Sequence, residues 1–224
     1  MTTSCRGRAS ARDAIDVDVI LFDLDNTLYE PESGLLEAGN RLITRFIAQR
    51  LAIGLEEADR IRVRTWREYG ATARGLEVEH GVPQSEFFAG SIEQLQVEKY
   101  LRRRPELVKM LRRLPQRLCV FTNAPGGYAR RVLQTLGIAD EMDKVMDISV
   151  ADGRPKPDFE CYDCVVEAVG ASPERIALVE DTEANLEPAA EIGMFTIKLG
   201  PPPPDTMHLC LESLTDLPRL LRQR

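Results

Sequence analysis

The chain has 224 residues, of which 43% are hydrophobic, and its formal net charge is −7. This length suffices for one large domain or two small ones with a sizeable core. The negative charge disfavours a general basic surface for a nucleic acid polymer, and no apolar run approaches the roughly 20 residues that span a bilayer. We therefore expect neither nucleic acid nor membrane as a partner.

Five cysteines are spread along the chain, an odd number without a preceding signal peptide. This pattern argues against a disulfide framework and favours a cytoplasmic location. Cys161 and Cys164 form a single C-x-x-C, without the second pair that a zinc site needs, and are expected to be packed thiols. Residues 1–16 carry three arginines but no clear apolar face, which predicts a disordered leader.

The segment Val17–Tyr29 is an apolar, β-branched run that ends in two carboxylates, Asp23 and Asp25. It reads as a buried strand that delivers acidic groups to its carboxyl end, where open α/β sheets hold ligands. Two acids this close repel each other unless a cation, a proton or hydrogen bonds compensate. An exposed turn with two solvated acids is the alternative.

Residues 31–101 show no strand pattern, and apolar residues recur there at helical spacing. A helical insertion directly after the acidic turn is placed to act as a lid. Within it, the segment Tyr69–Gly75 interrupts the helical pattern with two glycines around Thr72 and Arg74. This segment reads either as an interhelical loop or as a loop that faces the substrate.

From Pro105 onward, strands and helices alternate. Such alternation predicts a parallel sheet with right-handed crossovers, so the fold class is α/β, with a doubly wound parallel sheet and an inserted helical cap domain. The core domain is expected at residues 17–30 and 102–224, and the cap at 31–101. The expected elements are a helix over 105–114, a strand over 117–121, a helix over 128–136, a strand over 145–148, a helix over 159–169, a strand over 176–179, a helix over 184–192, strands over 194–199 and 207–211, and a helix over 215–221.

Polar residues follow four of these strands, and the carboxyl ends of parallel strands lie on one edge of a sheet. Acids alone would suit a divalent cation, but a hydroxyl, an amide and a lysine between two prolines indicate a site for a metal together with an anion such as phosphate. Each residue alone has a structural explanation, for example a surface lysine or acids that cap a helix. The set consists of Asp23 and Asp25, Thr122 and Asn123, Lys156, and Glu180 and Asp181.

In this set the sequence resembles the haloacid dehalogenase (HAD) superfamily of phosphohydrolases, with a Rossmann-like core and a C1-type cap in the place of the insertion. The four motifs appear as 23-DLDNT-27, 121-FTNA-124, Lys156 in 154-RPKP-157, and 180-EDT-182 with Asn185. The flanking residues 23-DLDNTLY-29, the cap segment 69-YGATARGL-76 and 180-EDTEANL-186 are similar to the pyrimidine 5'-nucleotidase branch. Glu180 stands where such families often carry a second Asp.

The resemblance implies a Mg²⁺-dependent phosphatase in which Asp23 attacks phosphorus, and Asp25 first protonates the leaving group and then activates water. The metal site would comprise Asp23, Asp181 and the main-chain carbonyl of Asp25, with Glu180 in support. Phosphate and substrate would contact Thr122, Asn123, Lys156, Thr27, Thr72 and Arg74, with Thr27 bracing the motif turn.

The expected substrate is a small soluble phosphomonoester, with nucleoside 5'-monophosphates first and UMP and CMP ahead of purine nucleotides on resemblance. A phosphosugar phosphatase or mutase is the alternative within the superfamily, and a catalytically silent regulatory or binding protein is an alternative of another class. Haloacid dehalogenation is disfavoured because it has no leaving oxygen for Asp25 to protonate. We expect a monomer or a weak homodimer.

Overall fold

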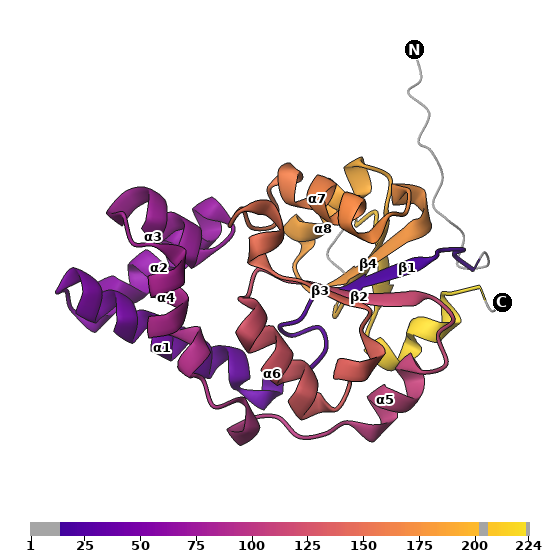
Figure 1. Cartoon of the computed structure of the whole chain (residues 1–224), viewed down its shortest axis with the longest axis horizontal. Coiled ribbons are helices and arrows are strands. Elements are labelled where there is room, and N and C mark those ends of the chain that lie inside the picture. Colours follow the sequence, from indigo (N-terminus) through magenta and orange to yellow (C-terminus); the bar gives the residue numbers. More distant parts are fainter. Residues whose placement is uncertain (1–13, 202–205, 223–224) are drawn as a thin grey trace, which may run out of the picture.

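A six-stranded, all-parallel sheet forms the centre of the computed structural model, which describes residues 14–201 and 206–222. The strand order is β3-β2-β1-β4-β5-β6, so β1 lies between its neighbours β2 and β4 (Figure 1). The prediction of a doubly wound parallel sheet is confirmed. The strands are β1 (Val19–Phe22), β2 (Arg117–Phe121), β3 (Lys144–Met146), β4 (Ile176–Glu180), β5 (Phe195–Leu199) and β6 (Leu209–Leu211).

Successive strand residues point to opposite sides of the sheet, so both faces carry apolar side chains, and helices cover both. Ile20 and Phe22 belong to a core cluster with the helices on one face, whereas Val19 and Leu21 belong to the cluster on the other. The first face is covered by α5 (Pro105–Leu111), α6 (Gly126–Leu136) and the 3-10 helix η7 (Leu214–Arg219), and the second by α7 (Phe159–Val169) and α8 (Glu183–Glu191). Buried strands therefore read as continuous apolar runs, as the sequence of β1 does.

The predicted helical insertion leaves the sheet after β1 and returns before β2, and it lies to one side of the sheet (Figure 1). It has a small core of its own, with Ile47, Ala58, Leu76 and Phe87 as buried members. Its elements are η1 (Pro31–Ser33), α1 (Leu35–Leu51), α2 (Leu55–Tyr69), α3 (Thr72–His80), α4 (Gln84–Gly90), η2 (Ile92–Gln94) and η3 (Val97–Lys99).

Several element boundaries differ from the sequence-based expectation. The third strand ends at Met146 because the side chain of Asp147 accepts a hydrogen bond from the backbone N–H of Ser149 and starts the 3-10 helix η5 (Ile148–Ala151). The last element is a 3-10 helix that contains Pro218, instead of an α-helix. Short 3-10 helices η4 (Ala139–Glu141) and η6 (Pro173–Arg175) occupy two further connections.

The expected interruption at Tyr69–Gly75 is shorter than predicted. Gly70 ends α2 with a left-handed φ of 75°, and α3 begins at Thr72. Gly75 lies within α3, where a Cβ atom would come within 2.4 Å of the Cβ of Thr65. This glycine therefore allows α2 and α3 to pack closely and does not form a loop.

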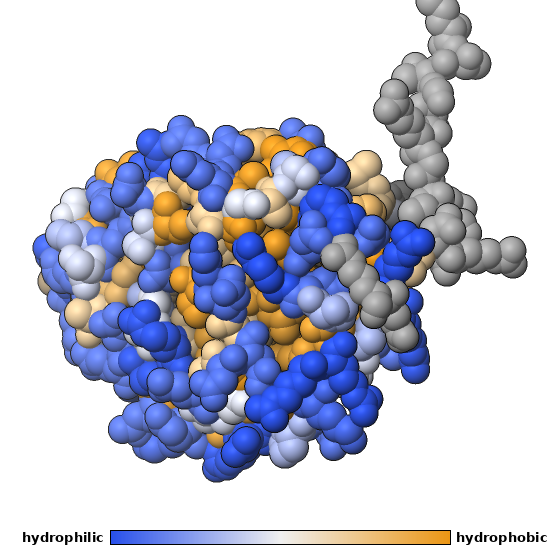
Figure 2. All heavy atoms as spheres, turned by 45° about the vertical axis from the view of Figure 1, so that its right-hand side comes forward, coloured by the Kyte–Doolittle hydropathy of each residue, from blue (hydrophilic) through white to orange (hydrophobic). Residues whose placement is uncertain are grey.

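The described part of the chain begins and ends on the side of the molecule opposite the insertion (Figure 1). Figure 2 brings this side forward and shows apolar side chains gathered near the middle of the face, with hydrophilic ones around them. Residues 1–13 of the expected leader lie outside the described residues, whereas Ile15 is buried and forms a bridge with Leu221. No helix among the described residues is long and apolar enough to cross a membrane.

Candidate active site

The four sequence motifs meet at the carboxyl ends of β1, β2 and β4. The Lys156 Nζ atom lies 2.8 Å from Asp23 Oδ1 and 2.7 Å from Glu180 Oε2, and it donates a third hydrogen bond of 2.9 Å to the carbonyl oxygen of Phe121. Asp23 and Lys156 are 133 positions apart in the sequence. The short strands and their shared edge bring these residues together, as the parallel sheet predicts.

Lys156 is buried, with 1% of its surface exposed, and it is fully occupied by these three acceptors. Burial alone would lower its pKa, but the two carboxylates raise the pKa above the ordinary lysine value, so the ammonium stays charged. Its ammonium also lies over the Phe121 ring, 4.9 Å from the centroid. In this geometry Lys156 orients Asp23 and compensates its charge.

A cluster of three carboxylates suits a divalent cation. Asp23, Glu180 and Asp181 each offer an oxygen, and these oxygens all lie within 4.8 Å of one another. Burial and neighbouring negative charge raise the pKa of all three, to about 6 for Asp23, although Lys156 lowers it in each case. Hard cations prefer such oxygen donors and would relieve the repulsion, so the residues present fit Mg²⁺.

Glu180 differs from the other two acids in this cluster. Its Oε2 accepts from Lys156, and its Oε1 accepts a hydrogen bond of 3.0 Å from the backbone N–H of Thr182. Both oxygens thus already bind protein groups, which leaves Asp23 Oδ2 and Asp181 as the more available donors.

Asp25 makes contacts that the sequence analysis did not predict. Its Oδ1 accepts hydrogen bonds of 2.5 Å from the Tyr29 hydroxyl and 2.8 Å from the Tyr128 hydroxyl. Burial and the nearby charge of Asp23 raise the pKa of Asp25 to about 6, although the two hydroxyls lower it. The two carboxyl groups therefore have different partners. Asp23 forms an ion pair with Lys156, whereas Asp25 accepts hydrogen bonds from the neutral hydroxyls of Tyr29 and Tyr128.

The second motif lies next to the lysine. The Thr122 hydroxyl accepts a hydrogen bond from the Ala124 N–H and lines the cavity described below. The Asn123 side chain hydrogen-bonds to both the N–H and the carbonyl of Lys156, so its amide holds the lysine loop.

The Thr27 Oγ1 atom, in the turn of the first motif, is buried without a hydrogen-bond partner among the described residues, so the motif turn is not braced through that hydroxyl. The turn is closed instead by the Leu28 N–H, which donates to the Leu24 carbonyl.

A cavity of about 400 Å³ opens above these residues, between the core and the helical insertion. Thr72 lines it, and its hydroxyl donates to the Arg62 carbonyl, whereas Arg74 does not line it. Arg74 instead pairs with Glu77, one turn along α3, because helical spacing brings the two side chains together. The insertion also contributes Leu36, Asn40, Ile43, Arg62, Trp66, Phe87, Phe88 and Ile92 to the lining.

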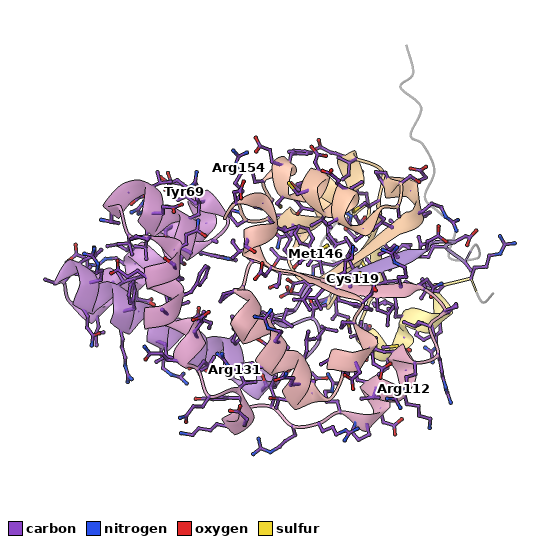
Figure 3. The ribbon with its side chains drawn as sticks, viewed as in Figure 1. Tyr69, Arg112, Cys119, Arg131, Met146 and Arg154 are labelled. Carbon is purple, nitrogen blue, oxygen red and sulfur yellow. The ribbon has the colours of Figure 1, made fainter. Side chains whose placement is uncertain are left out.

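Three hydrogen bonds that join the insertion to sequence-distant parts of the core end on main-chain carbonyl oxygens. Gln84 Nε2 donates to Gly153 O at 2.9 Å, Asn123 Nδ2 donates to Gly70 O at 3.4 Å, and Arg131 donates to Glu93 O at 2.8 Å. Figure 3 shows Tyr69 on the insertion and Arg154 on the core, on either side of this junction. The contact is close at Gly70, where a Cβ atom would come within 2.3 Å of the Lys156 carbonyl oxygen.

The fold and this site define a phosphoric monoester hydrolase, as predicted. The Asp23 carboxylate is held by a buried lysine, and the carboxyl group of Asp25 lies with it in the lining of a small cavity. Residues 17–193 match the model of the haloacid dehalogenase-like hydrolase family. The chain belongs to this family.

Three known proteins illustrate the relationship. The chain is 27% identical over 195 residues to Phosphate metabolism protein 8 of Saccharomyces cerevisiae, covering 79% of this chain but only 59% of that protein. It is 27% identical over 185 residues to the Validoxylamine A 7'-phosphate phosphatase of Streptomyces hygroscopicus subsp. limoneus, covering 81% and 84%. Its fold resembles the HAD phosphatase from Thermococcus onnurineus with a TM-score of 0.64 and 17% identity, covering 91% of this chain and 97% of that one.

Proposed function

We propose that the protein is a Mg²⁺-dependent phosphatase that hydrolyses a nucleoside 5'-monophosphate through an aspartyl-phosphate intermediate. The observation that carries this proposal is the buried Asp23–Lys156 ion pair, with Asp25 beside it at the cavity. An ionised carboxylate with a charged partner is a nucleophile, and a second carboxyl group two residues along the chain serves as acid and base.

The carboxyl groups of Asp23 and Asp25 have different roles in this mechanism. Asp23 is held as an anion by Lys156 and attacks phosphorus. Asp25, which has no cationic hydrogen-bond partner in the part of the chain that the structure describes, gives a proton to the leaving oxygen as the P–O bond breaks. Asp25 then takes a proton from the water that hydrolyses the aspartyl-phosphate. The predicted phosphate contacts, Thr122 and Asn123, flank the same site.

Mg²⁺ fits the charge balance of the site. Asp23, Asp25, Glu180 and Asp181 surround one lysine, so a phosphate dianion meets net negative charge unless a cation is added. Asp23, Asp181 and the main-chain carbonyl of Asp25 would hold the ion, with Glu180 in support. When bound, it would neutralise phosphoryl oxygens.

The lining of the cavity supports a nucleoside as the leaving group. Trp66 lies in the lining with 51% of its surface exposed, and Asn40 adds an amide with both donor and acceptor atoms. An aromatic face with an amide suits a flat, polar base. UMP and CMP are the first candidates because of the motif resemblance.

We further propose that residues 31–101 act as a C1-type cap on a core of residues 17–30 and 102–224. We propose that the protein is a cytoplasmic monomer or weak homodimer.

Phosphate release from a panel of nucleotides and sugar phosphates, with and without Mg²⁺, tests the proposal. We expect release that requires Mg²⁺, is fastest with pyrimidine nucleotides, and is lost in Asp23→Asn, while thermal unfolding shows that this variant still folds. Trp66→Ala is expected to raise KM for UMP more than for phenyl phosphate. Phosphatase activity retained by Asp23→Asn would refute the assignment of the nucleophile.

The two alternatives give different outcomes in the same assay. A phosphosugar phosphatase would release phosphate fastest from sugar phosphates, and a mutase would return the phosphoryl group to a sugar phosphate instead of releasing it to water. A catalytically silent protein would release none from any member of the panel, with Mg²⁺ present.

A further inference from the structure

Two buried tyrosines, Tyr29 and Tyr128, donate hydrogen bonds to Asp25. Tyr29 and Tyr128 each have 1% of their surface exposed, and neither is among the residues that line the cavity. Tyr29 follows Asp25 by four positions in the turn after β1, whereas Tyr128 comes from the first turn of α6. Asp25 itself is half-buried and lines the cavity.

Both hydroxyl groups bind the same oxygen. Tyr29 and Tyr128 donate to Asp25 Oδ1 at 2.5 and 2.8 Å, and their own oxygens are 3.4 Å apart. A carboxylate oxygen has two lone-pair sites, so two donors occupy Oδ1 fully. The other oxygen, Oδ2, has no hydrogen-bond partner among the described residues and is therefore the oxygen available to the reaction.

The pair also limits the rotation of the carboxyl group. The terminal torsion of an aspartate is broad when nothing holds it. Donors from two different elements, one on the β1 turn and one on α6, fix the plane of the group from two directions. A general acid must lie within hydrogen-bonding reach of the atom that it protonates, so this orientation bears directly on the proton transfer.

We propose that Tyr29 and Tyr128 are positioning residues that hold Asp25 by Oδ1, so that Oδ2 delivers the proton to the leaving oxygen and later accepts one from water. This inference rests on the proposed phosphatase function. It assigns roles to two residues outside the four sequence motifs, and it specifies which oxygen of Asp25 reacts.

The test uses Tyr29→Phe, Tyr128→Phe and the double variant of the full chain. kcat/KM is measured with 4-nitrophenyl phosphate, whose leaving group departs without a proton, and with phenyl phosphate and UMP, whose leaving groups need one. We expect a loss of at least about ten-fold for phenyl phosphate and UMP but within about two-fold for 4-nitrophenyl phosphate. The matched control is Tyr162→Phe, a buried tyrosine whose hydroxyl donates to the Asn185 carbonyl and does not contact Asp25.

A second measurement separates positioning from folding. In an Asp25→Ala background, Tyr29→Phe and Tyr128→Phe should leave the residual 4-nitrophenyl phosphate activity unchanged, because their target is gone. The inference would be overturned by equal losses for all three substrates, by no loss, or by a further loss in the Asp25→Ala background. In each of these cases, turnover by the wild-type protein would leave the proposed phosphatase function intact. Absence of turnover by the wild-type protein would overturn both.

Discussion

The side chain of Asn123 forms a two-point hydrogen-bonded contact with the backbone of Lys156. Its Oδ1 accepts from the Lys156 N–H at 2.8 Å, and its Nδ2 donates to the Lys156 carbonyl at 3.0 Å. The lysine ammonium is thus positioned from both ends, by Asn123 at the backbone and by Asp23 and Glu180 at Nζ.

Replacing Asn123 with alanine should loosen the lysine loop without removing a charge. We expect Asn123→Ala to lower kcat/KM by about 10- to 100-fold and to cost about 1–3 kcal/mol of unfolding free energy, because two backbone groups lose their partners. Steady-state kinetics and urea unfolding measure the two effects. Wild-type kinetics in this variant would show that the loop needs no such support.

The pKa of Asp25 predicts a pH-dependent stability change. Because its pKa rises from 3.8 to about 6 on folding, chiefly through burial, the protonated form stabilises the fold. That stability is fully present below 3.8 and is lost as the pH rises through about 6. Asp25→Asn, which keeps an acceptor oxygen for the two tyrosines, should therefore stabilise the metal-free protein at about pH 8 by up to about 3 kcal/mol.

The gain should shrink toward about pH 5, where the wild-type carboxyl group is mostly protonated. Thermal unfolding of both proteins in a chelator across this range provides the comparison. A gain that is constant with pH would mean that burial of the ionised Asp25 is not the cause.

Gly70 and Gly81 form a matched pair for testing the contact between insertion and core. Both have left-handed φ values, 75° and 63°, so alanine costs a similar backbone strain at each. A Cβ atom at Gly70 would meet the Lys156 carbonyl oxygen at 2.3 Å, whereas one at Gly81 would meet nothing within 4 Å. We expect Gly70→Ala to lower kcat/KM by about ten-fold or more, since small displacements at a site are costly, and Gly81→Ala to have little effect. Equal kinetics in the two variants would rule out a role for this contact.

Metal binding should be visible without turnover. A ligand that binds only the folded state raises the melting temperature, so excess MgCl₂ should raise that of the wild-type protein. Asp181→Asn removes one carboxylate of the three-acid cluster and should abolish most of this shift. Differential scanning fluorimetry with and without MgCl₂ measures it, and an equal shift in both proteins would place the ion elsewhere.

The sequence was sufficient to predict the convergence of the four motifs. Asp23 follows β1, Glu180 is the last residue of β4, and Lys156 lies in the loop region after β3. Parallel strands share an edge, so the proximity of these residues follows from the fold class. The same reasoning could not find Tyr128, which lies 103 positions from Asp25 on α6. Only the packing of that helix against the sheet shows which of its residues faces the acid, whereas the spacing of Tyr29 from Asp25 within one turn was a local signal.

Arg74 shows the limit of motif resemblance within the insertion. The segment around it was read as an interruption, but α3 starts at Thr72, and helical periodicity then sets the direction of each side chain. The cavity lining from α1, α2 and α4 also depends on how these helices pack, which the apolar pattern of one helix does not specify.

The main-chain acceptors at the junction have a consequence for how this enzyme can diversify. Gly153, Gly70 and Glu93 contribute main-chain carbonyl oxygens to the seam between the two parts. A Cβ atom would come within 2.3 Å of the Lys156 carbonyl oxygen at Gly70 and within 2.7 Å of Gln84 Nε2 at Gly153, so the seam restricts the residue type at these two glycines. Residues such as Asn40 and Trp66 face the cavity and take no part in the seam. New substrate preferences can therefore be selected by exchanging cavity side chains while the contacts between the insertion and the core are preserved.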